Sequence, residues 1–112
     1  MTKTILIVDD EVRYRELYMH ILDSAGFKTQ EASSAEQAYD IISNYAPDMV
    51  VTDVRMPGMS GLELAETARR DHAELKIIVI SGYFLPQRIG QRFLAKPFHM
   101  QELASAVRAE MG

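Results

Sequence analysis

The sequence contains no cysteine and no long hydrophobic run. Without cysteine, disulfides, thiolate zinc sites and cysteine nucleophiles are excluded. The apolar run near the N-terminus covers only residues 5–8 before acidic residues follow, which is too short for a signal-peptide core or a membrane span. We therefore expect a cytoplasmic protein that does not contact a membrane.

Basic residues are in the minority: 12 Lys and Arg stand against 16 Asp and Glu, a formal net charge of −4. Direct nucleic-acid binding usually needs a basic face, so it is not expected here. Of the 112 residues, 47% are hydrophobic and 25% are charged, the balance of one ordinary globular domain. Because nothing repeats and nothing is low in complexity, we expect a single domain over residues 1–112.

Three segments of strand length are nearly all apolar and rich in β-branched residues: 4–8, 49–52 and 76–80. Such runs are typical of strands covered on both faces, as in a parallel sheet. Residues 27–32 and 91–95 are mixed in polarity, as edge strands tend to be. The sequence therefore predicts three central strands and two edge strands.

Amphipathic segments of helical period lie between the strands. Gly26 ends the first helix, and two helix starts carry the residue pair of a capping box, Ser33 with Glu36 and Ser60 with Glu63. The predicted apolar faces of the first, third and last helices are Tyr14, Leu17, Tyr18, Ile21, Leu22 and Ala25; Leu62, Ala65 and Ala68; and Met100, Leu103, Ala104, Val107 and Met111.

This alternation of strands and helices predicts an α/β fold, a doubly wound five-stranded parallel sheet of order 2-1-3-4-5 with right-handed crossovers. An α+β domain with another strand order is the alternative. In a doubly wound sheet, ligands bind at the carboxyl ends of the strands where the order reverses, here between the first and third strands.

Carboxylates gather at that point. The first strand ends in Asp9, Asp10 and Glu11, and the third ends in Asp53. Two carboxylates about 4 Å apart repel by roughly 4 kcal/mol at an effective dielectric near 20, so a cation is expected there, and hard oxygen ligands at an open crevice suit Mg²⁺. The alternative is that Asp9 and Asp10 only cap the first helix, which leaves Asp53 unexplained.

Two more strand ends complete this edge. The fourth strand ends at Ser81, and the fifth ends at Lys96. Each alone is compatible with a solvated loop residue. Together with the carboxylates they form a set suited to phosphoryl transfer: nucleophile, metal ligands, hydroxyl donor and counter-charge.

At this point the sequence resembles the receiver domains of two-component response regulators, the superfamily of CheY. The resemblance covers nearly the whole chain. Four segments carry it, in order: Ile5-Leu6-Ile7-Val8-Asp9-Asp10-Glu11, Asp53-Val54-Arg55-Met56-Pro57-Gly58-Met59-Ser60-Gly61, Ser81-Gly82 and Lys96-Pro97-Phe98.

The resemblance implies a role for each matching position. Asp53 would accept a phosphoryl group from a sensor histidine kinase, a phosphotransfer protein or a small donor. Asp10, Asp53 and the backbone carbonyl of Arg55 would bind Mg²⁺, with Asp9 assisting mainly through water. The remaining matching residues are Ser81 and Lys96, which would contact the phosphoryl group, and Phe93, which matches the switch aromatic and is equally compatible with plain core packing.

The same resemblance implies a signalling domain rather than a turnover enzyme, one that controls a downstream protein or an attached effector domain. It is compatible with a stand-alone receiver and with a part of a longer regulator or hybrid kinase. One departure stands out. Only 14 residues separate Ser81 from Lys96, about two helical turns fewer than usual, so the fourth helix of the receiver fold, expected within residues 82–90, should be short or absent.

Three other readings share some of these features. A flavodoxin-like cofactor binder would need a hydroxyl- and glycine-rich loop after the first strand, where this chain has acidic residues. A phosphatase of the haloacid dehalogenase type would need an Asp-x-Asp motif there and a cap domain. A pseudo-receiver that only binds partners would not need the intact acidic set.

Overall fold

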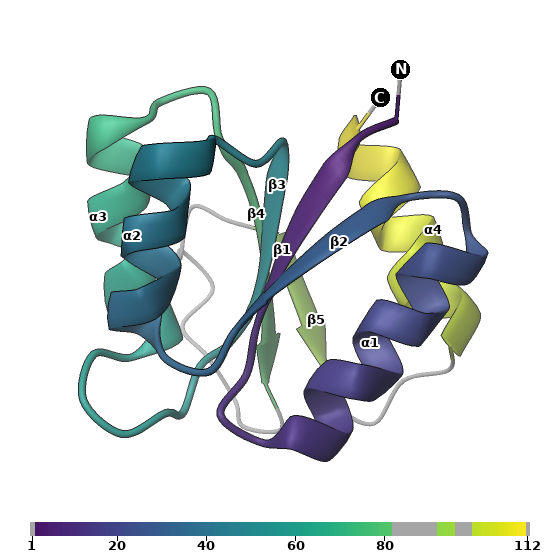
Figure 1. The fold of residues 1–112 in the computed structure, drawn as a ribbon, viewed down its shortest axis with the longest axis horizontal. Helices are drawn as coiled ribbons and strands as arrows, with labels where there is room; N and C mark the ends of the chain where they lie inside the picture. The colour runs from purple at the N-terminus through teal and green to yellow at the C-terminus, as the bar shows by residue number, and fades with distance from the viewer. Residues whose placement is uncertain (1, 82–91, 96–99, 112) are drawn as a thin grey trace.

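Five parallel strands form one sheet in the computed structural model, which describes residues 2–81, 92–95 and 100–111. The spatial order is β2-β1-β3-β4-β5 (Figure 1). The bounds are Thr4–Val8 for β1, Lys28–Ala32 for β2, Met49–Asp53 for β3, Lys76–Ser81 for β4 and Arg92–Ala95 for β5. The predicted α/β fold and strand order are confirmed.

Two layers of helices cover the sheet (Figure 1). Helices α2 (Ala35–Tyr45) and α3 (Gly61–Asp71) lie on one face, and α1 (Val12–Ser24) and α4 (Met100–Met111) lie on the other. The fourth helix along the described chain is thus α4, after β5. The segment between β4 and β5, for which a short or absent helix is predicted, lies outside the described residues. None of the described helices is long and apolar enough to span a membrane.

Side chains of the central strands alternate between two separate apolar clusters. Ile5, Ile7, Met49 and Val51 belong to the cluster beneath α1 and α4, whereas their neighbours along β1 and β3 belong to the cluster beneath α2 and α3. The strands are in register, with Ile7 opposite Val51. Side chains along a strand alternate between the two faces with a period of two. Asp9 follows Ile7 by two residues and Asp53 follows Val51 by two, so their carboxylates lie on the same face of the sheet.

The apolar face predicted for α1 is only partly correct. Tyr18, Ile21 and Leu22 are buried, but Tyr14 is 46% exposed and Leu17 is 42% exposed. Leu17 lies at the margin of the helical stripe defined by the buried residues. Tyr14 lies in the first turn, at the edge of the sheet, where its ring stacks on that of Tyr18 with the centroids 6.1 Å apart.

One of the two predicted capping boxes is also misplaced. The N-cap of α2 is Ser34, whose hydroxyl accepts a hydrogen bond from the Gln37 N–H, while the Gln37 side chain accepts one from the Ser33 N–H at 2.8 Å. The N-cap is therefore one residue later than predicted, and the reciprocal capping box does not form, because the Gln37 side chain binds the N–H of Ser33 and not that of Ser34. Glu36 is left for another contact.

The box predicted for α3 is confirmed, because Ser60 and Glu63 bind each other's backbone N–H groups. On this helix Leu64 is fully buried together with Ala65 and Ala68, whereas Leu62 is only partly buried. The buried face of α3 is thus centred on Leu64 and not on Leu62 as predicted.

Helix α3 starts in close contact with the end of β3. The Gly61 N–H donates to the Val54 carbonyl at 2.9 Å, and a Cβ at Gly61 would lie 1.9 Å from the Asp53 carbonyl oxygen. Only glycine fits here without moving β3 or α3.

We expect Gly61→Ala to lower the free energy of unfolding by about 3 kcal/mol, because β3 and α3 must separate. Gly26→Ala is the control. Gly26 has a φ of +95° but nothing within 4 Å of its Cβ position, so its loss should be about 1 kcal/mol. Urea unfolding of both variants measures the difference, and equal losses would contradict the close approach at Gly61.

Candidate functional site

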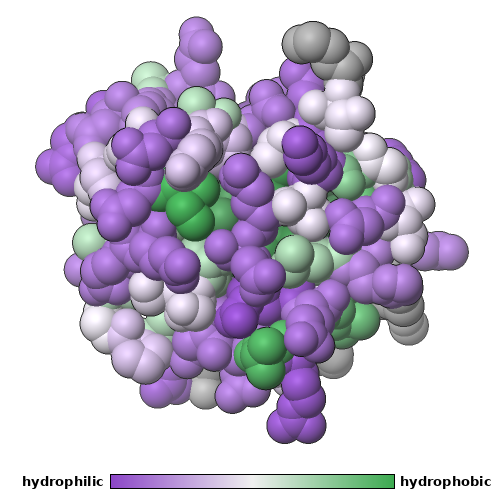
Figure 2. Space-filling view, in the orientation of Figure 1, coloured by the Kyte–Doolittle hydropathy of each residue, from purple (hydrophilic) through white to green (hydrophobic). Residues whose placement is uncertain are grey.

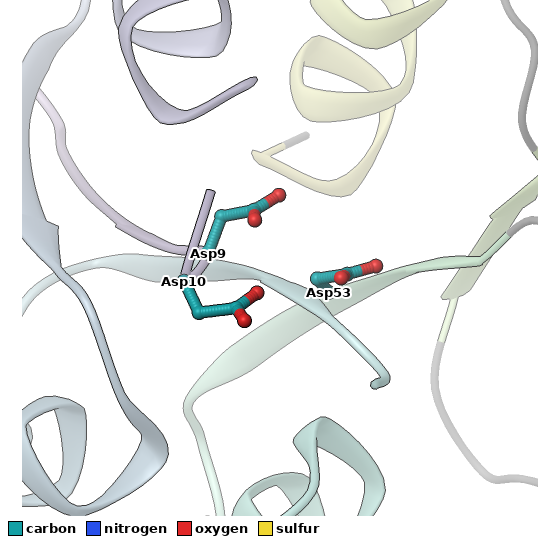
Figure 3. A group of neighbouring side chains, drawn as sticks. All are labelled: Asp9, Asp10 and Asp53. Atoms are coloured by element: carbon teal, nitrogen blue, oxygen red, sulfur yellow. The ribbon is translucent and has the colours of Figure 1, made fainter. Parts of the chain in front are cut away.

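Three carboxylates converge at the carboxyl edge of the sheet. Asp9 and Asp10 follow β1, and Asp53 ends β3; each offers an oxygen, and these oxygens lie within 4.8 Å of one another. In Figure 3 all three side chains point to the same side. Asp9 is 1% exposed, Asp53 is half-buried and Asp10 is exposed. The structure thus brings together the three carboxylates that the sequence predicts at this edge of the sheet.

Backbone and side-chain hydrogen bonds hold Asp9 in place. Its N–H donates to the Ala32 carbonyl at 3.2 Å, and its Oδ1 accepts from the Glu11 N–H at 2.9 Å. Arg15 Nη1 donates to the Asp9 carbonyl at 2.7 Å. The N-cap of α1 is Glu11, so neither Asp9 nor Asp10 is the N-cap residue, although the Asp9 carboxylate accepts a hydrogen bond from the Glu11 N–H.

The loop after Asp53 is fixed from two sides. Thr52 Oγ1 donates to the Asp53 carbonyl at 2.9 Å, and the Val54 N–H donates to the Ile80 carbonyl at 3.2 Å. At the far end of the loop, Glu36 of α2 accepts a hydrogen bond from the Met59 N–H at 3.1 Å. This bond to the Met59 N–H lowers the pKa of Glu36, helped by the bond from the Glu36 N–H.

Tyr18 approaches the carboxylates from α1. It is 3% exposed, and because helical side chains point toward the helix N-terminus, its ring extends toward the end of the helix that follows Asp10. Burial raises the pKa of the Tyr18 hydroxyl, and the negative charges of Asp9 and Asp53 raise it further, with a smaller contribution from Tyr14. Tyr18 therefore lies within electrostatic reach of the site, although the sequence indicated only a core position.

The structure describes some of the other predicted site residues fully and others only in part or not at all. Ser81 is 2% exposed at the end of β4, one residue beyond Ile80, which pairs with Asp53. Arg55 lies in the loop two residues after Asp53. Phe93 is in β5 opposite Val79, with its side chain outside the described part of the structure. Lys96 lies outside the described residues altogether.

The donor chemistry of this cluster fits a hard divalent cation. Three carboxylate oxygens, one exposed residue and no sulfur ligand match the preference of Mg²⁺, which is usually bound by one or two carboxylates while it keeps several waters. Asp9, Asp10 and Asp53 are the side chains that could hold such an ion.

Arg15, Glu36 and Gly61 also support the site, in roles that the sequence pattern does not predict. Glu36 was assigned to a helix cap instead. Arg15 had one available signal, since it follows the acidic turn by about one helical turn and the predicted strand order brings Glu31, near the end of β2, alongside.

Comparisons with known proteins agree on one family. A family model described as the response regulator receiver domain matches residues 5–108. The phosphate regulon transcriptional regulatory protein PhoB of Pseudomonas aeruginosa is 34% identical, covering 96% of this chain and 51% of that protein. Sporulation initiation phosphotransferase F of Bacillus subtilis is 30% identical, covering 96% of this chain and 93% of that protein. The chain thus spans about half the length of the first relative and nearly all of the second.

A solved structure of a response regulator also has a similar fold. The response regulator protein TrrA of Thermotoga maritima, in complex with Mg(2+)-BeF, superposes with a TM-score of 0.90 at 32% identity, covering 96% of this chain and 98% of that chain.

The carboxylate cluster predicts opposite effects of one substitution with and without metal. Asp10→Asn removes one of three repelling charges, so the metal-free protein should gain up to about 1 kcal/mol of unfolding free energy, a modest value because water screens exposed Asp10. Wild type should gain about 2.7 kcal/mol at a Mg²⁺ concentration 100 times the dissociation constant, and Asp10→Asn far less. Thermal melts with and without Mg²⁺ measure both effects. Equal stabilisation of the two proteins by Mg²⁺ would rule Asp10 out as a ligand.

The Glu36–Met59 hydrogen bond predicts a pH-dependent contribution to stability. Since folding lowers the pKa of Glu36, its contribution is fully present above its ordinary pKa and is lost as the pH falls through the lowered value. Glu36→Gln should therefore be less stable than wild type at pH 7, and the difference should shrink in acid. Urea unfolding between pH 7 and 3 tests this, with Glu66→Gln on the exposed side of α3 as control. A difference independent of pH would contradict it.

Proposed function

The chain belongs to the response regulator receiver domain family, and from that premise we propose that it is a switch controlled by phosphorylation of Asp53. The observation that supports the proposal most is the convergence of Asp9, Asp10 and Asp53, whose oxygens lie within 4.8 Å of one another at the carboxyl edge of the sheet. We take residues 1–112 as one receiver domain.

In the proposed reaction, a carboxylate oxygen of Asp53 attacks the phosphorus of a phosphohistidine or a small phosphodonor. The bond from phosphorus to the donor atom breaks as the acyl phosphate on Asp53 forms, and the leaving group takes the electron pair. Asp9, Asp10, Asp53 and the Arg55 carbonyl would hold Mg²⁺, and the ion would supply positive charge next to the phosphoryl oxygens.

The other residues would respond to the new phosphoryl group. The Ser81 hydroxyl donates a hydrogen bond to it, and the Lys96 ammonium pairs with its charge. Phe93 on β5 changes rotamer as Ser81 moves, which carries the state of the site to the surface of the domain. These roles rest on the matching family motifs.

We propose as partners a sensor histidine kinase or phosphotransfer protein upstream and a protein target or attached effector domain downstream. Direct contact with nucleic acid or a membrane is not part of the proposal. With these partners the domain would work in the cytoplasm. It would promote its own phosphorylation and dephosphorylation without acting as a turnover enzyme.

Asp53→Asn tests the acceptor. Wild type incubated with acetyl phosphate and Mg²⁺ should gain the mass of one phosphoryl group, and the variant should not, because a neutral amide replaces the nucleophilic carboxylate. Asp40→Asn, an exposed carboxylate of α2, is the matched control and should label like wild type. Intact-protein mass spectrometry with peptide mapping measures the result. Labelling of Asp53→Asn at the wild-type rate would end the assignment.

A further inference from the structure

Arg15 joins the acidic turn to the neighbouring edge of the sheet. Its Nη1 donates to the carbonyl oxygen of Asp9 at 2.7 Å, and its Nε donates to Glu31 Oε1 of β2 at 2.7 Å. The Arg15 side chain is 13% exposed, whereas the Glu31 side chain is 52% exposed. The guanidinium is thus largely buried beside the carboxylate cluster, with its charge balanced by Glu31.

The carbonyl that Arg15 binds belongs to the peptide between Asp9 and Asp10. A peptide unit is planar, so holding its oxygen restricts the backbone torsions on both sides of it, and with them the directions of the Asp9 and Asp10 side chains. The N–H of Asp9 is held separately by the Ala32 carbonyl. The exposed Asp10 side chain accepts no hydrogen bond from the part of the chain that the structure describes, so its placement depends on the backbone that carries it.

We infer that Arg15 is a positioning residue for the metal site, which aims Asp9 and Asp10 at Asp53 by holding the peptide between them, and that Glu31 orients the Arg15 guanidinium. The inference rests on the proposed function, because it assumes that a cation binds at these carboxylates. Arg15 itself does not touch the cation.

The direction in which the Mg²⁺ dissociation constant changes when Arg15 is removed distinguishes a positioning role from a purely electrostatic one. The positive charge of Arg15 near the cluster should weaken cation binding through space, so removing it should tighten binding if charge alone mattered. Removing a hydrogen bond that orients the ligands should weaken binding, typically by about tenfold or more. The two explanations thus predict opposite changes of the Mg²⁺ dissociation constant.

Arg13 provides a matched control, because it lies on the same helix, carries the same charge and is exposed. Isothermal titration with Mg²⁺ should give a dissociation constant about tenfold or more higher for Arg15→Ala than for wild type. For Arg13→Ala it should be unchanged or slightly lower. Arg15→Lys should recover part of the affinity, since an ammonium can donate to the Asp9 carbonyl but lacks the planar fork that also binds Glu31. Glu31→Gln should show a loss of a few-fold.

A second measurement distinguishes positioning from a general loss of structure. In labelling by acetyl phosphate, Arg15→Ala should need more Mg²⁺ for half-maximal rate and reach a near wild-type rate at saturation. A partly unfolded protein would lose maximal rate instead, which would overturn the inference. Should Arg15→Ala fail to fold, Arg15→Lys and Glu31→Gln carry the test, and wild-type affinity in both would overturn it.

The remaining outcomes separate the two proposals. Wild-type binding of Mg²⁺ together with unchanged or tighter binding by Arg15→Ala would overturn the positioning role alone. Absence of Mg²⁺ binding by wild type would overturn the metal site of the proposed function and the inference with it.

Discussion

Mutual repulsion of three carboxylates is the constraint on which the rest of this structure depends. Asp9, Asp10 and Asp53 are brought within a few ångströms by the register of β1 and β3, where their like charges destabilise the metal-free fold. The neighbouring backbone opposes this repulsion: strand pairing, the turn at Glu11 and the Arg15 contact hold the carboxylates together. A site that stores charge in this way responds strongly to anything that neutralises it.

The fold was largely predictable because its central strands carry an unambiguous signal. β1, β3 and β4 are nearly continuous β-branched runs, and a parallel sheet buried on both faces is the structure that suits them. Local details were less predictable. A serine pair at residues 33–34 offers two possible N-caps. The second is used, with Gln37 bonded to both serines and Glu36 bonded to the distant Met59 N–H. Tyr14 has the right helical phase for the core but lies where the sheet ends.

Part of the candidate site could also be predicted from the sequence, and part could not. The placement of Asp9, Asp10 and Asp53 follows from strand ends and strand order, both of which can be inferred from the sequence. The supports of the site come from contacts between distant segments: Arg15 with Glu31, Glu36 with Met59, and Gly61 against Asp53. Arginine and glutamate on a helix are usually solvated, so residue type alone does not mark Arg15 or Glu36. For Arg15 the available signal is the strand order that brings Glu31 alongside, and a glycine in the sequence does not show which segment will pack against it.

The sheet also separates the buried apolar residues of the described chain into two layers with no side chain in common. Figure 2 shows that the outer surface in this view is mostly hydrophilic with only small separate hydrophobic areas. Substitutions in layers that do not touch usually have additive effects on stability. A lineage can therefore diversify the packing and outer surface of α1 and α4 while it conserves those of α2 and α3, or the reverse. Such modularity lets one chemical site at the sheet edge be combined with many different recognition surfaces over evolutionary time.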